Sequence, residues 1–123
     1  MNAGASATLV EGDAEHGRVH IEKRHGFKIG EANSWHLENG TTMAALTALL
    51  AEAQGMVKGQ WKASPDRVNP EQINCIAVAN FGRQVGWQVR NRDVDPPNLK
   101  PLNSLFLVVR ANDLQVISMF PTK

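Results

Sequence analysis

The chain has few of the residues with which small proteins cross-link themselves or bind metal ions. Its 123 residues include one cysteine, Cys75, and no tyrosine. A lone cysteine excludes an intramolecular disulfide and a cysteine-based zinc site. Because Cys75 lies in an apolar run, we interpret it as a small buried hydrophobic residue. The length fits one domain with a hydrophobic core that is large enough to fold without cross-links.

Long apolar runs are absent as well. No segment approaches the ~18 consecutive apolar residues of a membrane-spanning helix. The first 14 residues lack the basic and apolar regions of a secretion signal. Small residues dominate between Asn2 and Thr8, which predicts a flexible linker over residues 1–14 and a single domain over residues 15–123.

Charge is unevenly distributed, although the formal net charge is only +1. Residues 1–57 carry four basic and seven acidic side chains, whereas residues 58–123 carry nine basic and five acidic ones. The second half is therefore better suited to bind a polyanion. The alternative is a solvated basic surface that binds nothing.

Helices are predicted in the first half of the chain. Apolar residues recur with helical spacing at Met43, Leu46, Leu50, Ala53 and Val57. This spacing predicts a helix over residues 43–57, with Thr41 or Thr42 as its N-cap. We also expect a brief helix over residues 35–37, capped by Ser34. Residues 18–22 fit either a short strand or the first turns of a helix.

Strands are predicted in the second half. Alternating or continuous apolar residues favour strands over residues 73–81, 85–89, 104–110 and 114–120. We expect a hairpin between the first two, through residues 81–83, and another between the last two. Prolines and polar residues predict a connector over residues 63–71 and a long loop over residues 92–101. Helices followed by antiparallel strands indicate an α+β fold.

All four histidines, His16, His20, His25 and His36, lie within 21 residues of one another. An imidazole with a pKa of roughly 6.5 both accepts and donates protons near neutral pH. The spacing lacks the His-Glu-x-x-His pattern of zinc enzymes, so a metal site is weakly supported. Acyl transfer is also weakly supported, because Ser118 lies within a predicted strand rather than on a Gly-x-Ser-x-Gly turn.

Cleavage of RNA fits the histidine cluster better than either alternative. The 2′-hydroxyl of RNA is its own nucleophile, so a protein without metal needs a base, an acid and donors for the charged phosphorus intermediate. Two histidines with a lysine, an arginine or a hydroxyl meet those needs. Lys23, Arg24 and Lys28 lie among the histidines.

Five short segments together resemble one family of toxins. They are His20-Ile-Glu-Lys-Arg-His25-Gly-Phe-Lys28, the predicted helix continued to Trp61, Phe81-Gly-Arg-Gln-Val-Gly86, Leu107-Val-Val-Arg110 and Ile117-Ser-Met-Phe-Pro121. In this order, over about residues 16–121, the chain is similar to the bacterial pancreatic-ribonuclease-like domain at the C-termini of contact-dependent growth inhibition proteins.

The resemblance implies a fold, an activity and a biological role. The fold would be that of pancreatic ribonuclease without its disulfides, with N-terminal helices packed on a twisted antiparallel sheet. The activity would be a metal-independent RNA endonuclease without a cofactor, with tRNA among its candidate substrates. The domain would be exported as the C-terminus of a larger cell-surface protein, act in the cytoplasm of a neighbouring bacterium and be neutralised by a cognate immunity protein.

The resemblance also assigns residues. His25 matches the histidine of the family's Arg-His-Gly/Val region, and His36 occupies a position where the family has an arginine. The family's Thr-x-Tyr-Pro corresponds to residues 118–121, in which Ser118 keeps a hydroxyl and Phe120 loses one.

We therefore expect His25 and His36 to form the acid–base pair. Ser118, helped by Lys28 or Arg24, would stabilise the transition state, and His20 is the alternative imidazole. Substrate binding would use the arginines of the basic half, Arg83, Arg90, Arg92 and Arg110, together with Arg24. Trp87 would either stack on an unpaired base or pack in the core between Val85 and Val89.

A binding module without catalytic activity, such as an immunity or adaptor protein, is the alternative function. Glu52 is the only charged residue between Met43 and Val57. A helix with so little charge is either buried in the core or in contact with a partner.

Overall fold

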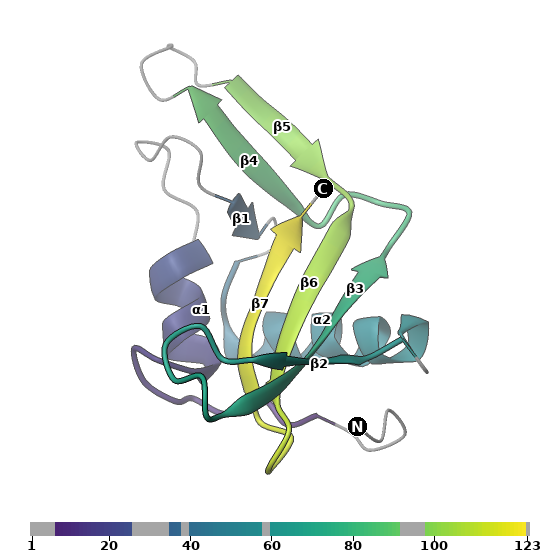
Figure 1. Ribbon diagram of the computed structural model, residues 1–123. Coiled ribbons are helices and arrows are strands. Elements are labelled where there is room, and N and C mark those ends of the chain that lie inside the picture. Colours follow the sequence, from purple (N-terminus) through teal and green to yellow (C-terminus); the bar gives the residue numbers. More distant parts are fainter. Residues whose placement is uncertain (1–6, 26–34, 38–39, 58–59, 92–97, 123) are drawn as a thin grey trace.

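The computed structural model describes residues 7–25, 35–37, 40–57, 60–91 and 98–122. These residues form helices and antiparallel strands, which confirms the predicted α+β class (Figure 1). In chain order the elements are α1 (Gly17–His25), β1 (Trp35–Leu37), α2 (Met43–Met56), β2 (Lys62–Pro65), β3 (Ile73–Asn80), β4 (Gly86–Asn91), β5 (Asn98–Leu102), β6 (Ser104–Arg110) and β7 (Val116–Thr122). One sheet has the order β2-β3-β6-β7 and the other has the order β1-β4-β5.

The two helices occupy different positions around the larger sheet. Figure 1 shows α2 behind the four-stranded sheet and α1 beside β7, while the β4–β5 hairpin extends away from one end. Within the described parts of the chain, neither helix is long and apolar enough to cross a membrane.

The predicted helix over residues 43–57 is confirmed as α2. Thr42 is its N-cap and accepts a hydrogen bond from the backbone N–H of Ala45 at 3.2 Å. Val57 ends the helix, and its N–H donates to the carbonyl of Ala53. The buried residues of α2 are Leu46, Leu49, Leu50 and Ala53. One face of this helix is therefore in the core, and its opposite face is exposed.

The predicted hairpin of the last two strands is confirmed, and its first strand is central. β6 pairs with β3 on one side and with β7 on the other. Leu105, Leu107 and Val109 of β6 have no exposed surface and belong to the same apolar cluster as α2. Cys75 on β3 is 1% exposed, as expected of a buried hydrophobic residue.

A β-bulge interrupts the pairing of β6 with β7. Val109 lies opposite Val116 and Val108 lies opposite Ser118, so Ile117 is an extra residue on β7. Val116 is directed into the core with Val109. After the bulge, Ser118 shares the face of Val108, which is opposite to the face covered by α2.

The segment at residues 35–37 is a strand, so the prediction of a brief helix there is wrong. These residues pair with β4, and His36 lies opposite Trp87. A three-residue strand has no periodicity of its own, and its conformation follows from the partner strand, about 50 residues later in the chain.

The expected hairpin through residues 81–83 is also wrong. The N–H of Phe81 donates to the carbonyl of Asn103, and that of Val85 donates to the carbonyl of Leu102. Residues 81–85 therefore lead from one sheet to the other, because β3 pairs with β6 whereas β4 pairs with β1 and β5.

Two segments predicted as irregular contain short strands. β2 lies at the start of the expected connector and pairs with β3, whereas residues 66–72 form a turn. β5 lies at the end of the expected loop and pairs with β4, while residues 92–97 are outside the described chain. Both strands contain proline and lie at a sheet edge, where a missing N–H costs little.

The N-terminal segment contacts the domain. Thr8 donates its N–H to the carbonyl of Leu114 and accepts from the N–H of Val116. Thr8, within the predicted linker, is thus hydrogen-bonded next to the β6–β7 turn, and residues 1–6 lie outside the described chain. Residues 18–22, which fit a strand or a helix, belong to α1.

Candidate active site

Three elements that carry predicted catalytic residues meet in the fold. α1 contacts both β7 and β1, and β1 contacts β7 (Figure 1). The first of these elements ends at His25, the second contains His36 and the third contains Ser118. Residues that are up to 93 positions apart in the sequence are therefore on adjoining elements.

Ser118 is the most unusual polar residue at this junction. It is 5% exposed, and its Oγ has no hydrogen-bond partner among the described residues. A buried hydroxyl without a partner costs free energy, so such groups require an explanation. A ligand oxygen that accepts from this hydroxyl would supply one.

His25 is placed by the helix that it ends. It follows Ile21 by four residues, so the two positions share one face of α1. Ile21 has no exposed surface and belongs to the core cluster with Met119 of β7. The position of His25 is therefore on the side of α1 that adjoins the sheet.

His36 shares a sheet face with Trp87, because the two residues lie directly opposite each other on β1 and β4. Trp87 is partly buried and also lies opposite Pro101 of β5. The strand that carries Trp87 contacts β7. The side chains of Arg24, His25, His36 and Arg90 lie outside the described part of the structure, as do Lys28 and Arg92 entirely.

His20 has a fixed orientation. Its Nδ1 lies 2.8 Å from the carbonyl oxygen of Ala14, so Nδ1 donates the hydrogen in this bond, and the lone pair of the matching neutral tautomer is on Nε2. That tautomer has the form that a general base requires. His16, in contrast, lies 3.1 Å from the carboxylate of Asp13 on the surface. The pKa of Asp13 is lowered, first by the backbone N–H of Glu15.

Two predicted RNA-binding arginines have protein partners. Arg83 donates from Nη2 to both carboxylate oxygens of Glu52, at 2.8 and 2.7 Å, and its guanidinium lies 5.1 Å from the ring centre of Phe81. Arg110 donates to Asp113 and Gln115 of its own hairpin. Arg83 therefore lies near α2, whereas Arg110 lies at the turn of the β6–β7 hairpin.

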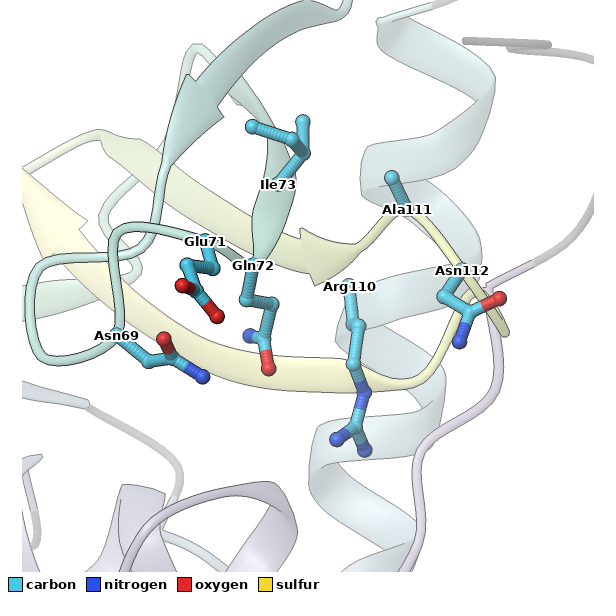
Figure 2. Close-up of a pocket in the computed structure, with 7 residues that line it drawn as sticks. All are labelled: Asn69, Glu71, Gln72, Ile73, Arg110, Ala111 and Asn112. Carbon is cyan, nitrogen blue, oxygen red and sulfur yellow. The ribbon is translucent and has the colours of Figure 1, made fainter.

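A shallow depression of about 470 Å³ lies beside Arg110 (Figure 2). The residues that line it are Asn69, Glu71, Gln72, Ile73, Arg110, Ala111 and Asn112. None of the predicted catalytic residues is among them. The depression is thus separate from the junction of α1, β1 and β7.

Asp66 organises the turn next to this depression. It accepts from the N–H groups of Val68 and Asn69, and from Nδ2 of the buried Asn74 at 2.8 Å. The hydrogen bond from Asn69, followed by those from Asn74 and Val68, lowers the pKa of the Asp66 carboxyl. Because the hydrogen bonds join neighbouring turn and strand residues, this network fixes the local backbone.

One feature near Ser118 has no counterpart in the predicted site. Phe106 and Phe120 stack with ring centres 5.1 Å apart and planes inclined by 19°. The sequence predicts β6 as apolar on both faces, but only the register with β7 shows that Phe106 lies opposite Phe120.

No protein family, curated protein or solved structure matches this chain.

Proposed function

We propose that this domain is a metal-independent RNA endonuclease, of the kind that the resemblance to pancreatic-ribonuclease-like toxins implies. The observation that carries the proposal is the buried hydroxyl of Ser118 on β7, which has no hydrogen-bond partner within the described part of the chain and lies where α1 and β1 adjoin that strand. The α+β fold with an antiparallel sheet of four strands is consistent with such a domain.

The reaction would proceed by attack of the ribose 2′-hydroxyl on the adjacent phosphorus. One imidazole of the pair His25 and His36 accepts the 2′-hydroxyl proton as the new O–P bond forms. The other, as imidazolium, donates a proton to the 5′-oxygen as its bond to phosphorus breaks. The products are a 2′,3′-cyclic phosphate and a free 5′-hydroxyl.

The remaining groups would hold charge or substitute for an imidazole. Ser118 donates a hydrogen bond to a non-bridging oxygen, whose negative charge grows in the transition state. Lys28 or Arg24 adds positive charge. His20 is the alternative base, because its bond to Ala14 selects the neutral tautomer with the lone pair on Nε2.

The chemistry of the product ends tests this proposal. Purified protein is incubated with RNA in excess chelator, and the fragments are analysed for 2′,3′-cyclic phosphate ends. A substrate with a single 2′-deoxy substitution at the cleaved nucleotide should be resistant. Intact RNA, or fragments with 3′-hydroxyl ends, would exclude attack by the 2′-hydroxyl.

The toxin biology is part of the proposal and has its own test. We propose that the domain is delivered into a neighbouring bacterium as the C-terminus of a larger cell-surface protein, and that an immunity protein neutralises it. Expression inside a bacterium should arrest growth, and co-expression of the product of the adjacent reading frame should restore it. Normal growth of the expressing cells, together with a positive RNA digest, would support the nuclease activity and refute the role as a toxin.

A binding module is the second candidate, and α2 is the observation that favours it. The exposed residues of this helix include Ala44, Ala48 and Ala51, and its one charged residue, Glu52, is paired with Arg83. A negative RNA digest from a folded protein would favour this candidate.

A further inference from the structure

The outer face of the four-stranded sheet, opposite α2, is defined by strand register. Four rows of paired residues cross it, namely Ser64–Asn74–Arg110, Lys62–Ile76–Val108–Ser118, Val78–Phe106–Phe120 and Asn80–Ser104–Thr122. Paired residues of antiparallel strands share one face. Ser118 therefore lies on the same face as the aromatic pair, two positions along β7 from Phe120.

The Val78–Phe106–Phe120 row is apolar and open at one end. Val78 is 45% exposed, although it lies within a central stretch of β3. Phe106 is partly buried and stacks on Phe120, so the row presents two parallel rings followed by an exposed valine. A rigid aromatic surface on a sheet face is typical of proteins that stack unpaired bases on their strands.

The charge of this face indicates the kind of ligand. Its charged residues are Lys62 and Arg110, of which Arg110 is paired with Asp113, and none of its paired positions within β2, β3, β6 and β7 is acidic. Lys62 is exposed and lies in the same row as Ser118. An apolar row beside an exposed lysine suits a polyanion with flat apolar groups, which describes single-stranded nucleic acid.

We propose that this face binds single-stranded RNA by stacking an unpaired base on Phe106, in the Val78–Phe106–Phe120 row next to Ser118. This inference rests on the proposed function, since Ser118 marks the position of the reacting phosphate. Lys62 contacts a phosphate further along the strand.

The test measures binding of RNA that cannot be cleaved. The probe is a fluorescein-labelled octanucleotide with a 2′-O-methyl group on every ribose, and its dissociation constant is measured by fluorescence anisotropy. Phe106→Leu keeps an apolar side chain without a ring, and Phe106→Tyr keeps the ring. Phe81→Leu is the matched control, because Phe81 is a partly buried aromatic residue that lies against Arg83.

We expect Phe106→Leu to weaken binding by about 5- to 100-fold, the range for loss of one stacked base, and Phe106→Tyr and Phe81→Leu to bind like the wild type. A probe with one abasic nucleotide at the stacked position should reduce the difference between wild type and Phe106→Leu. Lys62→Gln should lower the slope of log affinity against log salt by about 0.7, as for one phosphate contact to a single strand. Circular dichroism of each variant verifies that it is folded.

Equal binding by wild type and a folded Phe106→Leu variant would overturn the inference. Absence of wild-type binding would also overturn it, and would leave the face to a protein partner. Because the probe cannot react, binding that depends on Phe106 in a protein that cleaves no RNA would support this inference and refute the nuclease. RNA cleavage by a protein whose RNA binding does not depend on Phe106 would refute this inference and support the nuclease.

Discussion

The four-stranded and the three-stranded sheets are held together in different ways. In the larger sheet, β6 pairs along its length with β3 and β7, and Leu105, Leu107 and Val109 are fully buried. In the smaller sheet, β1 has three residues and the β4–β5 pairing has an irregularity between Val89 and Asn91. The larger sheet and α2 contain most of the buried apolar cluster, to which the smaller sheet contributes Leu37, and the smaller sheet contacts β7 and α1. We infer that stability and catalysis depend on separate regions.

The largest expected effect concerns catalysis alone. His25→Ala should lower the rate of RNA cleavage by about 10²–10⁴-fold, because a proton-transfer group is removed. The unfolding free energy should change little, since α1 is held to the sheet by the buried Ile21. Cleavage of a fluorogenic RNA and thermal unfolding measure the two effects.

His16→Ala is the matched control, because His16 lies on the surface beside Asp13. It should cleave RNA at the wild-type rate. A folded His25→Ala variant with undiminished activity would remove His25 from the site. Unfolding of that variant would instead show that the two regions are not separate.

A change in the core should lower the stability of the fold. Leu107→Ala should lower the unfolding free energy by about 2–5 kcal/mol, because it leaves a cavity in the central strand. Urea denaturation measures this loss. Val78→Ala on the exposed face of β3 is the control, and should cost less than about 1 kcal/mol. Similar losses in the two variants would contradict the assigned faces of the sheet.

Ser118 lies where the two regions meet, so its substitution sharpens the comparison. Ser118→Ala should lower the cleavage rate by about 10²-fold, as for loss of one hydrogen-bond donor to the transition state. Stability should stay constant or rise slightly, because the lost hydroxyl is buried without a partner among the described residues. Ser118→Thr retains the hydroxyl and should retain activity. Normal cleavage by Ser118→Ala would refute its role.

The smallest effect is expected from Asp66, far from the proposed chemistry. The pKa of its carboxyl is lowered from 3.8, first by the N–H of Asn69, so the ionised group stabilises the folded state. This contribution is complete above pH 3.8 and is lost as the pH falls through the lower pKa of the folded protein. Asp66→Asn should therefore flatten the fall of the melting temperature below about pH 4. Parallel curves for variant and wild type would contradict this.

The regions also differ in how well the sequence predicts them. α2, β3 and the β6–β7 hairpin follow from local signals: a Thr42 cap, helical spacing, continuous apolar runs and a short polar turn. These signals arise because each element buries its own apolar side chains. β1, β2 and β5 have three to five residues, and their conformation depends on partners that local patterns do not identify.

For the candidate site, the sequence proposes residues but does not identify their neighbours. The histidine cluster and the resemblance single out α1, β1 and β7, and these elements adjoin in the fold. The pairing of Arg83 with Glu52 was not predictable, because their charges are 31 residues apart. The position of Phe106 beside Phe120 likewise depends on register, and a shift of one residue would change it.

The extra residue Ile117 affects both the direction of the side chains on β7 and the local bend of the strand. Because successive side chains alternate, Val116 and Ser118 would point the same way in a regular strand, and the hydroxyl would enter the core. Deleting Ile117 would make the strand regular yet keep valine inward and serine outward. Such a shortened protein would retain its interior while losing the local bend, so orientation and curvature could be varied independently when this scaffold is redesigned.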